Sequence, residues 1–144
     1  MTHHLKAFDS RLVHAGIRKD AYGSVVPPIY QTSTFAFDSA QQGAERFAGK
    51  SDGFIYTRLG NPTVSALEDC VATIEEGNGA IATASGMAAV STAYVALLKG
   101  GDHVVSTSSV YGPSRVLMER YMSKFGVTST YVDTSEPENV RRAM

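Results

Sequence analysis

The run Ser85-Gly86-Met87 lies where an apolar segment passes into a pattern typical of a helix. Gly86 allows a tight turn and the close approach of a ligand. The first N–H groups of a helix have no partner within it, and the helix dipole is positive at that end. The run therefore predicts an anion site suited to a phosphate. Ser-Gly also occurs at such turns for steric reasons alone, and the run matches neither a dinucleotide fingerprint nor a Walker loop.

A second pair of residues, Tyr56 and Arg58, stands two positions apart in a segment that we expect to be extended. Side chains two apart in an extended segment point to the same side. A phenol and a guanidinium on one side can both donate hydrogen bonds to one phosphate. The alternative is a surface arginine beside a packing tyrosine.

Tyr111 follows the apolar run His103–Thr107, which we expect to be a strand. Ligands of open α/β sheets bind beyond the carboxyl ends of the strands, so Tyr111 should lie at the same end of the sheet as Ser85 and Gly86. A tyrosine there can stack on a flat cofactor and transfer a proton. The alternative is a tyrosine that covers the core.

Two regions position these residues. Residues 1–60 show little sustained periodicity, and we expect an arm that packs on another subunit. Within it we expect a short helix over Ser10–Ala15, a strand-like run over Tyr30–Phe37, and a helix that Asp38 and Ser39 cap and that reaches Phe47.

Residues 61–144 alternate between helical and strand patterns, which predicts the first part of an α/β domain. We expect a three-layer α/β/α arrangement around a mostly parallel sheet. Three parallel strands would leave edges and faces uncovered, so we also expect the chain to be part of a larger protein. The expected elements are a helix from Asn61-Pro62 to Gly77, a strand over Gly79–Ala84, helix Gly86–Leu98, strand His103–Thr107, helix Pro113–Lys124, strand Val127–Val132 and a last helix with a Ser135–Glu138 capping box.

Composition limits the compartment and the partners. The 144 residues carry a net charge of −1 without a basic run, so neither nucleic acid nor an anionic membrane is an expected partner. Cys70 is the single cysteine, which fits a reducing cytoplasm. Met1–Lys6 has no apolar signal-like core. The four histidines, His3, His4, His14 and His103, do not have metal-ligand spacing, and we expect no metal site.

Taken together, five runs have an order and spacing that resembles the Cys/Met-metabolism family of pyridoxal 5′-phosphate (PLP) enzymes. They are Val26–Phe35, Tyr56–Thr63, Ala84–Ala89, Gly101–His103 and Tyr111-Gly112. The resemblance covers nearly the whole chain. Within the family, the runs Phe35–Phe37, Arg46–Gly49 and Tyr56–Thr63 look most similar to methionine γ-lyases.

The resemblance implies an incomplete PLP-dependent transferase fold of type I. It implies that the backbone of Ser85, Gly86 and Met87 holds the PLP phosphate, and that Tyr56 and Arg58 reach the phosphate from the neighbouring subunit. It implies that Tyr111 stacks on the pyridine ring and takes part in acid–base steps. It also implies a homotetramer built from tight dimers, with the N-terminal arm at the dimer interface, that acts on a small amino acid.

The implied activity of the whole enzyme is α,γ-elimination of the methionine γ-lyase type. Cystathionine γ-lyase activity and γ-replacement, by an O-acetylhomoserine sulfhydrylase or a cystathionine γ-synthase, stay open, because Pro113 stands where methionine γ-lyases commonly have a cysteine. The family anchors PLP on a lysine in a Ser-x-x-Lys context, which no lysine from Lys6 to Lys124 shares. We therefore expect the 144-residue chain alone to be inactive. A non-catalytic remnant or partner subunit is the alternative of another class.

Overall fold

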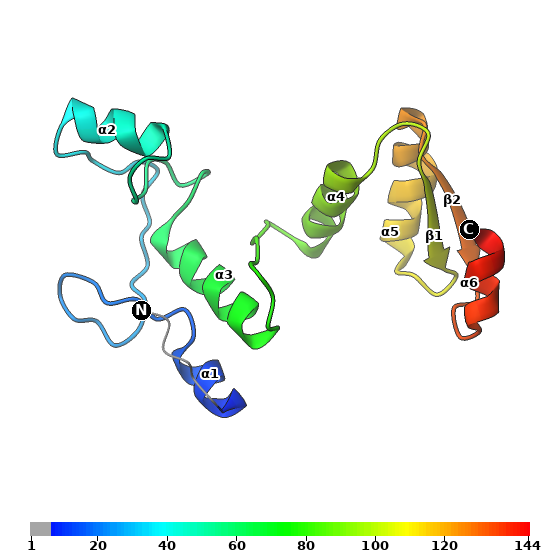
Figure 1. Ribbon diagram of the computed structural model, residues 1–144, viewed down its shortest axis with the longest axis horizontal. Helices are drawn as coiled ribbons and strands as arrows, with labels where there is room; N and C mark the ends of the chain where they lie inside the picture. The colour runs from blue at the N-terminus through cyan, green and yellow to red at the C-terminus, as the bar shows by residue number, and fades with distance from the viewer. Residues whose placement is uncertain (1–6) are drawn as a thin grey trace. The chain divides into compact units, whose positions relative to one another are not determined.

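The computed structural model describes residues 7–144, which form two compact units, one ending at Ala82 and the other covering Thr83–Met144 (Figure 1). Met1–Lys6, with His3 and His4, lies outside the described residues. No helix within residues 7–144 is both long enough and apolar enough to cross a membrane. The boundary that we expect after residue 60, between an intersubunit arm and a cofactor domain, stays a prediction.

The first unit is built on three helices, α1 (Phe8–His14), α2 (Ala40–Phe47) and α3 (Pro62–Ile74). Helix α1 contacts α3, and two ion pairs hold the segment around α1 to it. Arg11 donates to the Glu76 carboxylate at 2.7 Å, and Arg18 pairs with Asp69. Each helix was expected within a few residues of these bounds, and α3 ends at Ile74 instead of Gly77.

The caps of α2 and α3 are the expected ones. The Ser39 hydroxyl accepts a hydrogen bond from the backbone N–H of Gln42 at 3.1 Å. The Asn61 side-chain oxygen accepts from the Thr63 N–H at 2.9 Å, and Pro62 is the first residue of the helix. Such caps satisfy N–H groups that have no partner inside the helix.

Two strand predictions, Tyr30–Phe37 and Gly79–Ala84, are wrong. The run Tyr30–Phe37 forms only one antiparallel bridge, between Thr34 and Tyr56. Gly79–Ala84 forms no strand, and Ile81 is 81% exposed. A strand is stabilised by a paired neighbour, and the Ala82 N–H donates to the Glu68 carboxylate at 2.8 Å instead of to another strand.

The second unit is a small parallel α/β assembly. It contains α4 (Gly86–Leu97), β1 (His103–Thr107), β2 (Thr128–Val132) and α6 (Pro137–Ala143). Strands β1 and β2 pair in parallel from His103↔Thr128 to Thr107↔Val132. The parallel α/β arrangement is the expected one, with two strands instead of three within residues 7–144.

The connection between the two strands is helical but changes its winding. It begins as α5 (Gly112–Val116), widens to a π-helical turn η1 (Leu117–Tyr121) and tightens to a 3₁₀ turn η2 (Met122–Phe125). Gly126 ends it with φ 81°. The core of the unit lies under this connection, where Met118 and Met122 pack with Val127.

The predicted capping box before the last helix is wrong. The residue that precedes α6 is Glu136, which makes no side-chain cap. The Ser135 hydroxyl donates to the Asp133 carboxylate at 2.6 Å instead, because a serine two residues after an aspartate can close a local turn on it.

Candidate functional site

Tyr56 and Arg58 lie close together, as the sequence indicates, but the backbone that joins them is not extended. Tyr56 forms the bridge to Thr34, and the chain then turns, with the N–H groups of Leu59 and Gly60 donating to the Tyr56 carbonyl at 2.8 and 3.1 Å. The Arg58 guanidinium carbon lies 5.3 Å from the centroid of the Tyr56 ring. A turn can therefore present a phenol and a guanidinium to one anion as an extended segment would.

Both side chains face an open groove of the first unit. Tyr56 is 38% exposed, and Arg58 is exposed. The salt bridges found within residues 7–144 leave Arg58 out, so its donors are available to a ligand. The other residues of the groove are residues 29–33, Thr57, Asn61, Thr63 and Val64.

Ser85 caps α4 in the second unit and leaves its first N–H groups open. The Ser85 hydroxyl accepts from the Ala88 N–H at 3.1 Å, and its carbonyl accepts from the Ala89 N–H at 3.0 Å. Within residues 7–144 the backbone N–H groups of Gly86 and Met87 donate no hydrogen bond. A Cβ built on Gly86 would meet no atom within 4 Å, so the backbone is open to a ligand. These features fit a phosphate group.

Tyr111 stands between the end of β1 and the start of α5, and its side chain is 68% exposed. Its carbonyl accepts from the N–H groups of Ser114 and Arg115 at 2.9 and 3.2 Å, which fixes its backbone at the start of the helix. The phenol is thus free of the core. The alternative of a tyrosine that covers the core does not hold within this unit.

Helices α4 and α5, which follow Ser85 and Tyr111 respectively, contact each other in the second unit. The hydroxyl of Ser114, which is 5% exposed, lies 3.7 Å from the sulfur of Met87. The Ser91 hydroxyl donates to the Met87 carbonyl at 2.7 Å. The sequence does not reveal this contact of Ser114, because a serine inside a helical pattern gives no sign of its partner.

Asn61 is a second residue whose contacts the sequence does not reveal. It is 3% exposed, and besides its cap it donates to the Tyr30 carbonyl at 2.9 Å and to the Thr57 hydroxyl at 3.1 Å. The capping pattern predicts the hydrogen bond that the side-chain oxygen of Asn61 accepts. It does not predict the acceptors of the amide N–H groups, one of which is 31 residues away.

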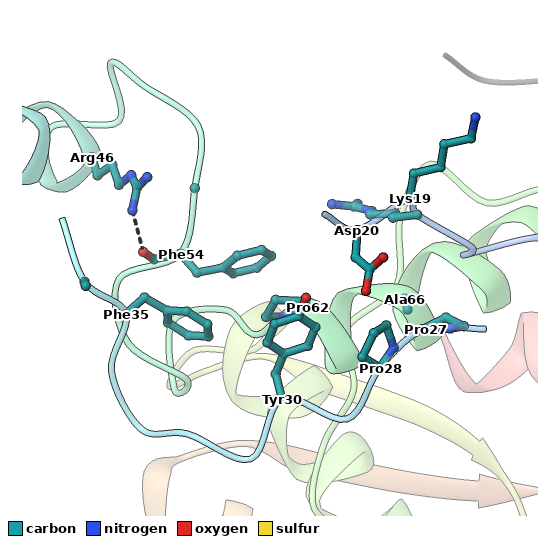
Figure 2. A pocket seen from close by; sticks show the side chains of 13 residues that line it. Lys19, Asp20, Pro27, Pro28, Tyr30, Phe35, Arg46, Phe54, Pro62 and Ala66 are labelled. Carbon is teal, nitrogen blue, oxygen red and sulfur yellow. Dashed lines mark hydrogen bonds between the residues drawn. The ribbon is translucent and has the colours of Figure 1, made fainter. Parts of the chain in front are cut away.

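The first unit also holds a cavity of about 430 Å³ that the sequence does not indicate. Figure 2 shows Arg46 at one end, where it donates to the Phe54 carbonyl at 3.2 Å, and Lys19 and Asp20 at the other. The rings of Phe35 and Phe54 lie 5.4 Å apart on its wall. Of its two arginines, Arg18 pairs with Asp69, and Nε of Arg46 is buried without a hydrogen-bond partner within residues 7–144.

Two carboxyl groups have lowered pKa values, and neither belongs to the predicted phosphate site. The backbone N–H and then the hydroxyl of Ser24 hold the pKa of Asp20 below its usual value. The hydroxyl and backbone N–H of Ser135 do the same for the pKa of Asp133. Both are local turns closed on a carboxylate.

Comparison with known proteins places these features in a family. The model of the Cys/Met metabolism PLP-dependent enzymes matches residues 9–144. An L-methionine γ-lyase of Fusobacterium nucleatum subsp. polymorphum is 52% identical over 132 residues, which are 92% of this chain and 33% of that protein. An O-acetyl-L-homoserine sulfhydrylase of Corynebacterium glutamicum is 39% identical over 95% of this chain and 32% of its own length.

The fold has close counterparts among solved structures. A Campylobacter jejuni protein, whose structure contains a pyridoxyl-lysine monophosphate, superposes with a TM-score of 0.87 and 31% identity. The match covers 95% of this chain and 34% of that one. The chain thus spans about a third of the length of the curated relatives that it matches. The predicted fold, an incomplete type I PLP-dependent fold, is confirmed.

Proposed function

Because the chain belongs to the Cys/Met metabolism family of PLP-dependent enzymes, we propose that it is the N-terminal portion of an enzyme that breaks the Cγ–S bond of methionine. The similarity to L-methionine γ-lyases supports elimination over the other reactions of the family. The substrate is a small amino acid, and the proposed assembly is a dimer of dimers in which the segment before residue 61 lies between subunits.

Different residues of the chain are proposed to bind the cofactor phosphate, to contact its ring and to transfer a proton. PLP, when bound, supplies an electron sink for the carbanion chemistry of the amino acid. The N–H groups of Gly86 and Met87 would hold its phosphate after the Ser85 cap, and Tyr56 and Arg58 would hold the same phosphate from the neighbouring subunit. Tyr111 would hold the ring by stacking and would supply a proton to the leaving sulfur.

The observation that carries this proposal is the contact between the starts of α4 and α5. The Ser114 hydroxyl lies 3.7 Å from the Met87 sulfur. This contact supports a common site for the open N–H groups of α4 and the exposed side chain of Tyr111. One ligand with a phosphate and a flat ring would use both features.

Elimination and replacement are distinguished by their products. The full-length parent, given methionine alone, should release methanethiol, ammonia and an α-keto acid. Given O-acetylhomoserine and sulfide, a replacement enzyme would instead release acetate and homocysteine. The second reaction is the alternative, and the similarity to an O-acetyl-L-homoserine sulfhydrylase supports it.

The isolated 144-residue chain is proposed to be inactive, since it holds no lysine in a Ser-x-x-Lys context. The competing proposal is a non-catalytic remnant or a subunit that pairs with a separately encoded remainder. The coding sequence after codon 144 distinguishes them. A frame that continues into a Ser-x-x-Lys segment supports the enzyme, and a stop without such a segment supports the alternative.

The phosphate role of Arg58 has a direct test in the parent. Arg58→Ala should weaken PLP retention more than it slows the chemical step, because each charge-assisted hydrogen bond contributes about 1.5–3 kcal/mol. Saturating PLP should restore much of the rate. At limiting PLP, where neither variant should be active alone, mixing Arg58→Ala and Gly86→Asp subunits should yield some active oligomer, and the cross-subunit proposal fails if no mixture is active.

A further inference from the structure

We propose that Asn61 is a positioning residue for the cofactor phosphate: its amide holds the turn that carries Tyr56 and Arg58. The inference rests on the proposed function of that pair. Asn61 itself is 3% exposed and is assigned no contact with the ligand.

The cap alone does not require an asparagine. Capping α3 uses only the side-chain oxygen, which accepts from the Thr63 N–H at 2.9 Å. Serine, threonine or aspartate supplies such an oxygen about as well. The amide adds two donors, and a buried amide with unpaired donors would be costly.

Both donors are used, and they join two distant segments. One hydrogen goes to the Tyr30 carbonyl at 2.9 Å and the other to the Thr57 hydroxyl at 3.1 Å. The Thr57 hydroxyl donates in turn to the Thr32 carbonyl. Asn61 is therefore the point at which the start of α3, the segment before Thr34 and the turn after Tyr56 meet.

The neighbouring hydrogen bonds give this junction a fixed register. The Thr57 N–H donates to the Ser33 carbonyl at 2.9 Å, beside the bridge between Thr34 and Tyr56. Thr57 lies between Tyr56 and Arg58, so a change in how its side chain is held moves both of the residues that flank it. A pair of donors that must meet one phosphate loses affinity when its geometry is not fixed in advance.

The test uses the full-length parent in its apo form, with PLP as the probe. Asn61→Asp keeps the capping oxygen and the shape but removes both donors, and Thr57→Val removes the hydroxyl that accepts from Asn61. The dissociation constant of PLP should rise about tenfold in each, from the loss of one or two positioning hydrogen bonds. The phosphorus NMR resonance of bound PLP should shift, and Thr57→Ser, which keeps the hydroxyl, should restore both values.

The control Ser39→Ala distinguishes positioning of the phosphate site from a general loss of stability. It removes the Ser39 hydroxyl that caps α2 by accepting from the Gln42 N–H at 3.1 Å. Ser39→Ala should lower the melting temperature of the apo enzyme, as Asn61→Asp should, while its PLP affinity and phosphorus resonance stay at their wild-type values. Should Asn61→Asp fail to fold, Thr57→Val decides alone.

Arg58→Ala distinguishes the positioning role of Asn61 from the phosphate role of Tyr56 and Arg58. If Arg58→Ala loses PLP while Asn61→Asp and Thr57→Val bind it with unchanged affinity and resonance, Asn61 is only a cap and the inference is overturned. If Arg58→Ala itself retains PLP normally, the proposed phosphate role of the pair is wrong, and the inference falls with it.

Discussion

Removing the phenol oxygen of Tyr111 should slow the reaction of the parent enzyme without changing its stability. The side chain is 68% exposed, and no hydrogen bond of its hydroxyl is found within residues 7–144. What fixes the residue is its backbone carbonyl, which accepts from Ser114 and Arg115 and is unchanged in Tyr111→Phe. The unfolding free energy of the parent should therefore stay within about 0.5 kcal/mol of wild type.

The rate should respond very differently. A thiolate leaves Cγ more readily when a proton is delivered to it, and general acid catalysis of this kind contributes about 10²–10⁴-fold. This corresponds to about 2.7–5.4 kcal/mol in the activation barrier. The ring remains in the variant, so PLP binding and absorbance should be kept. The loss should be larger for methionine than for O-acetylhomoserine, because acetate needs less protonation than methanethiol.

The assay compares initial rates of the full-length wild type and Tyr111→Phe on the two substrates, with bound PLP followed by absorbance. Tyr121→Phe is the matched control, since Tyr121 is an exposed tyrosine of the same unit outside the site, and it should keep its rate. Unchanged turnover of Tyr111→Phe on methionine would refute the acid role and leave Tyr111 as a stacking residue.

The remaining predictions concern stability and the isolated chain. Gly16→Ala should cost the parent at least about 1–2 kcal/mol, because φ there is positive and a Cβ would clash. That Cβ would lie 2.0 Å from the Ala66 carbonyl oxygen, whereas the control Gly23→Ala, at a similar φ of +74° in open space, should cost less in thermal unfolding. Ser135→Ala should raise the pKa of Asp133, seen by NMR titration. Because the pKa of Asp133 is lower in the folded than in the unfolded state, its ionisation stabilises the fold at pH values above the unfolded pKa. This stabilisation is lost as the pH falls through the folded pKa. Ser135→Ala should therefore be less stable than wild type at neutral pH and equally stable in acid. The isolated chain should show no turnover and no borohydride-trappable PLP adduct at one lysine, and a stoichiometric adduct with turnover would contradict this. It should also self-associate through its exposed apolar side chains, and a sharp monomer peak in size-exclusion chromatography with a cooperative melt would argue against that.

The features that the sequence predicts well are those whose partners are close in the chain. Ser39 and Asn61 each cap a helix by accepting from an N–H two or three residues later. Such a pattern is complete within a few residues, so it can be read without the rest of the fold. Strands differ, because pairing comes from elsewhere, and Gly79–Ala84 has the composition of a strand without a partner strand in the structure.

The same distinction divides the residues of the candidate site. Tyr56, Arg58 and Tyr111 can be proposed from the sequence because their side chains are themselves able to bind a phosphate or transfer a proton. The contacts of Asn61 and Ser114 cannot be, because the partners, Tyr30 and Met87, lie about 30 residues away in the chain. Buried polar groups of this kind must find partners, so each one fixes where two distant segments meet. Motifs therefore indicate which groups could bind a phosphate or move a proton, whereas the contacts of the buried asparagine and serine come only from the fold.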